Sequence, residues 1–228
     1  VGAAAGQTVF HLHVHVIPRY RGDVPDPRGG VRHVIPGKAR YWDAVRDASS
    51  GYEPAAAPLL TIGGSDSSLL KQLKLRLATA KSVDVAVAFV MPSGLELLYP
   101  SLEEALCRGT RIRVLTGDYL DATDPTALLL LLDLRSDRGK IERRVYRTQS
   151  AREFSWPDSF HPKAYIVHDR DGEGHAFVGS SNLSRTALVD GIEWNYRVVF
   201  SRDRSGFAEI CASFEELFLH PATTELTH

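Results

Sequence analysis

Residues 160–195 read FHPKAYIVHDRDGEGHAFVGSSNLSRTALVDGIEWN and carry most of the information about structure and chemistry. His161 and Lys163 are two residues apart on a predicted strand, so their side chains should lie on the same face of it. Asp and Gly within residues 169–174 predict a tight connection to a second strand at residues 176–179. That strand ends in small and polar residues ahead of a predicted helix, where exposed backbone amides can bind a phosphate oxygen.

Outside this stretch, strand-like and helix-like patterns alternate. Residues 65–80 carry leucines at helical spacing behind Ser and Asp caps, and the Val-rich run at residues 83–90 is typical of a strand buried on both faces. This alternation predicts an α/β sandwich with a mixed central sheet. The other expected helices are residues 95–107, 125–134 and 205–219, and the other expected strands are residues 111–116, 142–147, 163–167 and 194–200.

The order of the polar residues resembles the signature of the phospholipase-D superfamily, a His-x-Lys followed by Gly-Ser-x-Asn. His161 and Lys163 match the first part, and residues 179–182 match the second. Glu193 and Asn195 downstream are typical of the nuclease-like branch of that superfamily. The resemblance implies a phospholipase-D-like α-β-α sandwich and a metal-independent phosphodiesterase that acts on DNA.

The resemblance extends over about residues 59–219 and has one departure. The superfamily motif commonly has Asp where this sequence has His168, and Asp169 follows one residue later. If the strand persists, alternation places Asp169 on the face of Lys163 and His168 on the opposite face. Domains of this kind also occur beside helicase domains in restriction, defence or repair proteins, which implies a helicase-linked parent protein.

By the resemblance, cleavage proceeds through a covalent phosphohistidine. His161 is the expected nucleophile or acid, and Glu193 is expected to orient the histidine. Lys163 and Asn182 are expected to hold the phosphate oxygens, with help from Ser180. The mechanism needs two histidines and the motif occurs once, so a homodimer that shares one active site is implied. No metal and no other cofactor is expected, and a decayed or purely structural site is the alternative.

A second motif lies near the start of the chain. Residues 8–18, TVFHLHVHVIP, alternate between polar and apolar, which places His11, His13 and His15 on one face of a predicted strand. Three histidines on one face can also be interpreted as a metal site. With its flanks, however, the motif resembles the histidine-triad (HIT) family of nucleotide hydrolases and transferases. That resemblance implies His13 as nucleophile, His11 and His15 as its support, and Gln7 nearby.

A complete histidine-triad domain needs roughly a hundred residues ahead of this motif. We therefore expect residues 1–47 to be the truncated C-terminal strand and loop of such a domain, inactive alone, and residues 48–58 to be a linker. Residues 59–228 are the expected phosphodiesterase domain, and the parent protein is expected to contain a complete histidine-triad domain. Nucleotide hydrolysis by His13 and a non-cleaving nucleic-acid-binding module remain alternative functions.

Composition and charge restrict the partners. With 43% hydrophobic and 24% charged residues the chain is globular, and a formal charge of −1 gives it no global basic field. Local excess of basic residues at 135–152 makes Arg143, Arg144 and Arg147 candidates for contacts with nucleic acid, DNA rather than RNA. A solvated connection between elements is the alternative for this segment. Trp156 and Phe160 could stack on a base, with covering of the core as the alternative.

Cysteine usage and hydropathy predict the compartment. Cys107 and Cys211 lack metal-ligand spacing and are expected to be buried free thiols, which suits a reducing environment. Apolar runs such as residues 127–132 are too short to span a membrane, and no secretory segment is present. We therefore expect a cytoplasmic protein without a membrane partner.

Overall fold

The computed structural model describes residues 59–62, 68–118, 122–154 and 159–227, which belong to the second of two units of the chain, Pro58–His228. The predictions for residues 1–47, including the three histidines and Gln7, lie outside the described residues, as do those for the linker and Trp156. Within the described ranges, no helix combines the length and the apolar character that a membrane span requires.

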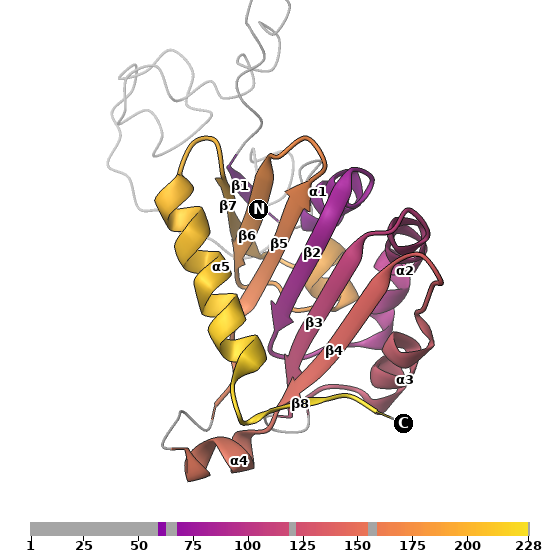
Figure 1. Cartoon of the computed structure of the whole chain (residues 1–228), viewed down its shortest axis with the longest axis vertical. Helices are drawn as coiled ribbons and strands as arrows, with labels where there is room; N and C mark the ends of the chain where they lie inside the picture. Colours follow the sequence, from indigo (N-terminus) through magenta and orange to yellow (C-terminus); the bar gives the residue numbers. More distant parts are fainter. Residues whose placement is uncertain (1–58, 63–67, 119–121, 155–158, 228) are drawn as a thin grey trace, which may run out of the picture. The chain divides into compact units, whose positions relative to one another are not determined.

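The described part of the chain is built on an eight-stranded mixed sheet (Figure 1). Its strands are β1 (Leu60–Ile62), β2 (Ala80–Val87), β3 (Arg111–Gly117), β4 (Lys140–Tyr146), β5 (Lys163–Asp169), β6 (Gly174–Gly179), β7 (Trp194–Val199) and β8 (Thr223–Glu225). The order across the sheet is β1-β7-β6-β5-β2-β3-β4-β8. β2, β3 and β4 are parallel, whereas β5 is antiparallel to β2 and β6, and β7 is antiparallel to β6. The predicted α/β fold with a mixed sheet is confirmed.

Helices cover both faces of the sheet. They are α1 (Leu69–Leu77), α2 (Pro92–Cys107), α3 (Pro125–Asp133), α4 (Thr148–Glu153), the π-helical turn η4 (Thr186–Asp190) and α5 (Arg204–Leu219). Figure 1 shows α5 on the viewer's side of the sheet and α1, α2 and α3 on the far side. Two hydrophobic clusters follow from this arrangement, one between the sheet and α1, α2, α3 and η4, and one between the sheet and α5.

The helical patterns explain which sides are buried. Leu69, Leu73 and Leu77 recur every four residues in α1, lie on one side of it and are buried. Phe207, Phe214 and Phe218 are seven and four residues apart in α5, so they also lie on one side of their helix, and they are buried against the opposite face of the sheet. The three-layer sandwich therefore rests on two amphipathic surfaces that the sequence periodicity predicts.

Some boundaries differ from the prediction. β2 covers Ala80–Val87 rather than residues 83–90, because the N–H of Phe89 donates to the side chain of Asn182 and no longer to a strand. α2 begins at Pro92, three residues earlier than predicted, because proline at the first helical turn needs no N–H and has a helical φ. β1, α4 and β8 were not predicted, since segments of three to six residues are too short to show periodicity.

The two cysteines differ from their prediction in burial. Both are free thiols, but Cys107 is exposed and Cys211 is only half-buried. Cys107 is the last residue of α2 and lies on its outer side, so the expectation of two buried thiols is wrong.

A buried ion pair fastens α5 to the sheet. Arg113 of β3 donates from Nε and Nη2 to the two carboxylate oxygens of Asp84 on β2, at 2.7 and 2.9 Å, and from Nη1 to Glu215 of α5 at 2.6 Å. Its guanidinium also lies over the rings of Phe214 and Phe218. Burial lowers the pKa of Arg113, but the hydrogen bonds and charges of Asp84 and Glu215 outweigh burial and raise it overall.

Removal of Asp84 should therefore be costly. Asp84→Ala leaves a buried guanidinium without its bidentate partner, and we expect a loss of about 3–5 kcal/mol in the free energy of unfolding. Glu215→Gln is the matched control, because the side chain of Glu215 is 47% exposed, and it should cost less than about 1 kcal/mol. Urea unfolding measures both, and equal losses would contradict the assignment.

Candidate active site

The predicted site residues gather at one end of the sheet. Val87 at the end of β2 pairs with Lys163 at the start of β5, and Gly179 at the end of β6 pairs with Asn195 at the start of β7. β5 and β6 are themselves antiparallel neighbours. The loops that follow β2 and β6 therefore meet the residues that precede β5 and β7 at a common edge.

His161 and Lys163 meet there, although not as predicted. β5 begins at Lys163, so the prediction that His161 lies on the strand is wrong. Pro162 between them has no N–H to give to a ladder, which explains why the strand starts only after it. Nζ of Lys163 lies 2.6 Å from Nδ1 of His161 and also donates to its carbonyl oxygen at 2.8 Å. The buried lysine thus fixes an exposed histidine.

This contact decides which nitrogen of a neutral His161 carries the proton. An ammonium group has three donors and no acceptor, so Nδ1 accepts from Lys163 and the proton lies on Nε2. A ring in this form can give up a proton from Nε2 but has no lone pair there for attack on phosphorus. Burial lowers the pKa of Lys163, while the charge of Glu193 raises it. The charge of Lys163 is therefore opposed by burial and favoured by Glu193.

Ser180 and Glu193 are held together across the ends of β6 and β7. The hydroxyl of Ser180 donates to Glu193 and accepts from the N–H of Trp194 at 3.1 Å. Gly179 allows this approach, because a Cβ at that position would collide with the carbonyl oxygen of Trp194. No hydrogen bond or ion pair joins Glu193 to His161 within the described residues of one chain. Orientation of a histidine by Glu193 therefore remains a prediction.

A buried network fixes the Gly-Ser-Ser-Asn loop from below. Nδ2 of Asn195 donates to Oγ of Ser181 at 2.8 Å, and that hydroxyl donates to the carbonyl oxygen of Ala187 at 3.2 Å. The phenol of Tyr165 donates to the carbonyl oxygen of Ser181 at 3.2 Å. Burial, followed by the charge of Glu193, raises the pKa of Tyr165, so the phenol keeps its proton. Sequence analysis noted Asn195 but assigned no role to Ser181 or Tyr165.

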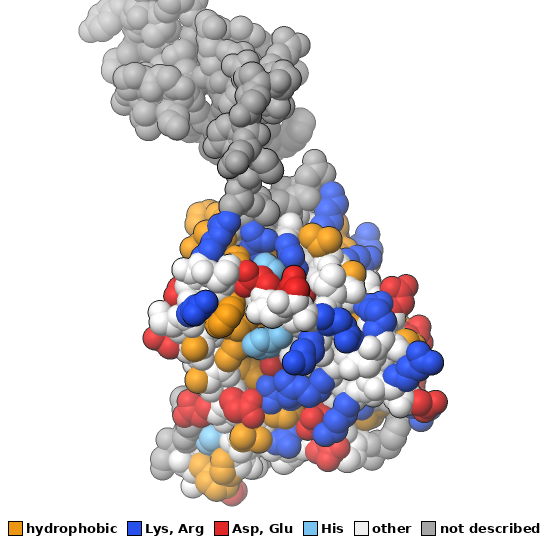
Figure 2. All heavy atoms as spheres, turned by 45° about the horizontal axis from the view of Figure 1, so that its top comes forward, with side chains coloured by type: hydrophobic (Ala, Val, Ile, Leu, Met, Phe, Trp, Pro, Cys, Tyr) orange, Lys and Arg blue, Asp and Glu red, His pale blue; other side chains and the backbone are white. Residues whose placement is uncertain are grey.

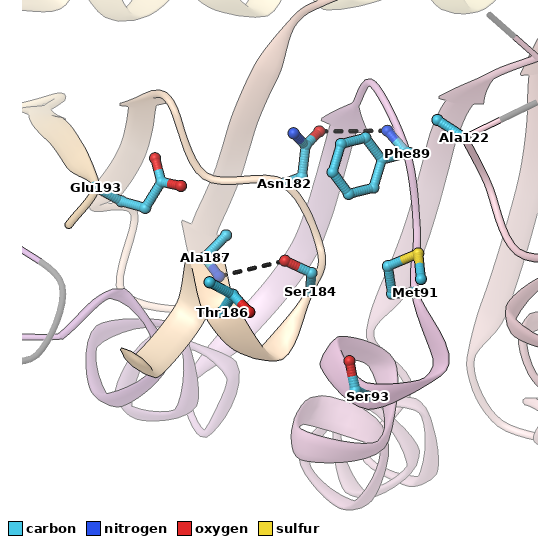
Figure 3. Close-up of a pocket in the computed structure, with 9 residues that line it drawn as sticks. All are labelled: Phe89, Met91, Ser93, Ala122, Asn182, Ser184, Thr186, Ala187 and Glu193. Atoms are coloured by element: carbon cyan, nitrogen blue, oxygen red, sulfur yellow. Dashed lines mark hydrogen bonds between the residues drawn. The ribbon is translucent and has the colours of Figure 1, made fainter. Parts of the chain in front are cut away.

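Asn182 stands between this loop and a hollow. Its side chain is 7% exposed, and its Oδ1 accepts from the N–H of Phe89 at 3.2 Å, so the Nδ2 end of the amide points the other way (Figure 3). Nδ2 makes no hydrogen bond with the described residues. The hollow has a volume of about 520 Å³. Its walls are formed by Phe89, Met91, Ser93, Ala122, Asn182, Ser184, Thr186, Ala187 and Glu193.

Asp169, which follows one residue after the usual position of the motif aspartate, lies far from this edge. Asp169 shares a face with Lys163, as alternation predicts, but sits at the other end of β5. It accepts from the hydroxyl of Thr79 at 2.8 Å and lies 3.4 Å from Nε2 of His175. His168 faces α5, with its ring against Phe207. Asp169 therefore ties α1 to the sheet and takes no part in the site.

The three candidate arginines have different surroundings. Arg143 donates to two carbonyl oxygens at the end of α3, and Arg144 donates to a carbonyl oxygen of α5 at 2.8 Å with its guanidinium over the ring of Phe218. Arg147 follows β4 at the same end of the sheet as His161 and is half-exposed, 3.7 Å from Asp118. Figure 2 shows Lys and Arg gathered on one face with Asp and Glu among and around them. Contact with nucleic acid stays a prediction, and Arg147 is the best placed of the three.

The sequence motif predicts no role for the loop residues of the hollow. Phe89 lies in the run at residues 83–90 that was predicted to be a strand, and Met91 and Ser184 lie outside the predicted elements, yet all three are in the loops that follow β2 and β6. Their position after the carboxyl ends of strands is the signal that could have found them, because ligands in open α/β sheets bind there. Among the described residues, no group of three or more His, Cys, Asp or Glu side chains is arranged to hold a metal ion.

A family model described as "Cardiolipin synthase, PLD-like domain" matches residues 73–220. The chain belongs to the phospholipase-D-like family. Members of this family are mostly phosphodiesterases. A second model, described as a HIT domain, matches residues 1–22, so both resemblances are confirmed. No match to a curated protein was found.

Solved structures show the same fold at low identity. Nuc, a phospholipase D family member from Salmonella typhimurium, has a TM-score of 0.50 at 15% identity, over 74% of this chain and 98% of that one. Phosphatidylserine synthase from Haemophilus influenzae has a TM-score of 0.50 at 17% identity, over 75% of this chain and 39% of the other. Polyphosphate kinase from Porphyromonas gingivalis reaches 0.51 at 14% identity, over 81% and 26%. The predicted phospholipase-D-like sandwich is confirmed.

The buried network makes a prediction about this phospholipase-D-like domain. Asn195→Ala removes the donor to Ser181, and we expect a loss of about 1–3 kcal/mol in the free energy of unfolding, because buried groups lose their partner. Amides at residues 180–183 should exchange hydrogen faster, since the loop opens locally. Ser180→Ala, at an exposed position of the same loop, is the control and should leave stability nearly unchanged. Unaltered exchange in Asn195→Ala would refute the role of the network.

Proposed function

We propose that the domain is a metal-independent phosphodiesterase that cuts DNA with His161. The contact between Nζ of Lys163 and Nδ1 of His161, at the sheet end where Asn182 also lies, carries this proposal. It supplies a ring nitrogen at the surface for proton or phosphoryl transfer, and cationic and amide donors for the non-bridging oxygens. The negative charge of a phosphodiester, which repels nucleophiles, is thereby balanced.

The reaction has two displacements and uses two histidines. In the first, Nε2 of one His161 attacks phosphorus and the P–O bond to the leaving strand breaks. The leaving oxygen takes the Nε2 proton of the partner's His161, while Nδ1 of that ring takes a proton from Nζ of the Lys163 that contacts it, so the ring stays neutral. In the second, water gives a proton to that second histidine and attacks phosphorus, and the P–N bond breaks. In the described chain, the contact with Lys163 keeps the proton of a neutral His161 on Nε2, where it can be donated. This supports the need for a second chain that supplies the attacking histidine.

The attacking histidine needs its proton on Nδ1, where a carboxylate can accept it. Glu193 is our candidate for this role, and it is bound by Ser180 within its own chain. We therefore assign Glu193 to the partner's His161 across a two-fold axis, with Ser180 holding the carboxylate in place. Lys163 and Asn182 bind the phosphate oxygens, and a homodimer shares the active site.

Support for DNA as the substrate comes from association. A match to a HIT domain at residues 1–22 joins this phosphodiesterase-type domain to a segment that is similar to nucleotide-handling enzymes. Arg147 at the site end of the sheet is available for a phosphate of the backbone. A helicase-linked restriction, defence or repair protein in the cytoplasm remains the proposed setting.

The first test separates this function from its alternatives. We expect cleavage of a DNA oligonucleotide to persist in EDTA and to fall at least about a thousandfold in His161→Ala, because removal of the nucleophile leaves only binding effects. His13→Ala is the matched control and should cleave normally. If His13→Ala is the inactive variant, nucleotide hydrolysis by the histidine triad is correct, and binding without cleavage by the wild type would favour a non-cleaving module.

The second test addresses the shared site. Wild-type chains refolded with a threefold excess of His161→Ala should pair at random, so roughly a quarter of the wild-type chains find a wild-type partner. Activity per wild-type chain should fall to about that fraction, since a mixed dimer has one histidine. Constant activity per wild-type chain would show that each chain works alone. A mixture with Glu215→Gln chains in place of His161→Ala is the control. Activity per wild-type chain should not fall in it, because every partner keeps His161.

A further inference from the structure

The hollow beside Asn182 has walls of two kinds (Figure 3). Phe89 and Met91, from the loop after β2, form an apolar side together with Ala122. The opposite side carries the polar groups of Asn182 and Glu193, and hydroxyls complete the lining. A volume of about 520 Å³ is within the range of pockets for small organic groups. The hollow adjoins the candidate site, because Asn182 and Glu193 belong to both.

Apart from the carboxylate of Glu193, the polar groups of the hollow include donors that face whatever enters. The oxygen of the Asn182 amide is used by the N–H of Phe89, which leaves Nδ2 as a donor at the rim. Oγ of Ser184 accepts from the N–H of Ala187 at 3.2 Å, so its own hydrogen is available to a ligand. Backbone amides thus take the acceptors and leave donors pointing inward.

The lining excludes two other occupants. Among the described residues, Glu193 lines the hollow and no Lys, Arg or His does, so a second phosphate would meet a negative charge without a counter-ion. A fatty acyl chain would offer no acceptor to the hydroxyl hydrogens of Ser93, Ser184 and Thr186, which is unfavourable for each of them. A flat, neutral group with hydrogen-bond acceptors on its edge satisfies both walls.

We propose that the hollow binds the nucleobase of the nucleotide next to the scissile phosphate, with Phe89 stacking on the base and Ser184 donating to its edge. This rests on the proposed function, in which Asn182 holds that phosphate at the rim. A group attached to a phosphate at Asn182 must then extend along the hollow. The backbone of Phe89 is fixed by Asn182, so its ring is preorganised, and stacking on an aromatic ring suits any base.

The test is a double-mutant cycle between protein and substrate. Phe89→Leu removes the aromatic face but keeps the backbone N–H that holds Asn182. On a normal oligonucleotide we expect kcat/KM to fall about tenfold. Two further oligonucleotides each carry one abasic nucleotide, on one side of the cut or on the other. The same substitution should have little effect on kcat/KM when the abasic nucleotide is on the side that the hollow serves. Phe89→Trp should retain most of the activity, because it keeps a stacking surface.

Two controls separate this inference from the proposed function. Phe200→Leu, at the far end of β7, should leave kcat/KM unchanged, and equal melting temperatures exclude unfolding. Hydrolysis of bis(p-nitrophenyl) phosphate by the wild type tests the phosphodiesterase without a base. If that activity is present but Phe89→Leu loses nothing, or loses equally on normal and abasic strands, the base site is refuted and the phosphodiesterase stands. If the wild type hydrolyses no diester, the proposed function fails and the base site with it.

Discussion

The buried hydrogen bonds between Asn195 and Ser181 are the constraint on which the site depends. Ser181 is fully buried between Ser180 and Asn182, so the loop can hold these two neighbours at the site only while its own polar groups are satisfied from below. Tyr165 completes that satisfaction from the adjacent strand β5. A buried hydroxyl or amide without a partner is expensive, and this cost keeps the loop in one conformation. The geometry of the candidate site is thus set by a polar network inside the sheet.

The strand order explains why two short loops are enough to build the candidate site. β5 and β6 are inserted as an antiparallel hairpin beside the parallel strands β2, β3 and β4. This insertion brings the start of β5 against the end of β2, so the loop that carries Phe89 lies opposite the loop that carries Asn182. Hydrogen bonds from the N–H of Phe89 to Asn182 and from the N–H of Met91 to the carbonyl oxygen of Leu183 join the two loops. The hollow and the histidine contact share the same edge for this topological reason. A purely parallel sheet would place the start of that strand at the opposite edge.

Much of the fold could be predicted from the sequence because periodicity reflects burial. The leucines of α1 and the apolar run of β2 indicate their elements directly, whereas β1 and β8 are defined by pairing with β7 and β4 and leave no local pattern. In the site, the motif identified the residues, but not their partners. Pro162 delays the start of β5 to Lys163, so His161 lies before the strand. The link of Glu193 to Ser180 depends on how closely β6 and β7 approach at Gly179. Such contacts arise from tertiary packing, which residue spacing alone does not encode.

The position of one proton connects the single chain to the symmetric site of the proposed homodimer. Lys163 holds His161 with its proton on Nε2, and a nucleophile needs that nitrogen free. Two identical chains can supply an acid and a nucleophile only if one histidine changes its partner from an ammonium to a carboxylate. The burial of Lys163, which lowers its pKa, makes the first partner easier to lose, and Glu193 provides the charge for the second. Symmetry in sequence is then compatible with asymmetry in protonation, and binding of an anionic phosphate is the event that can separate the two roles.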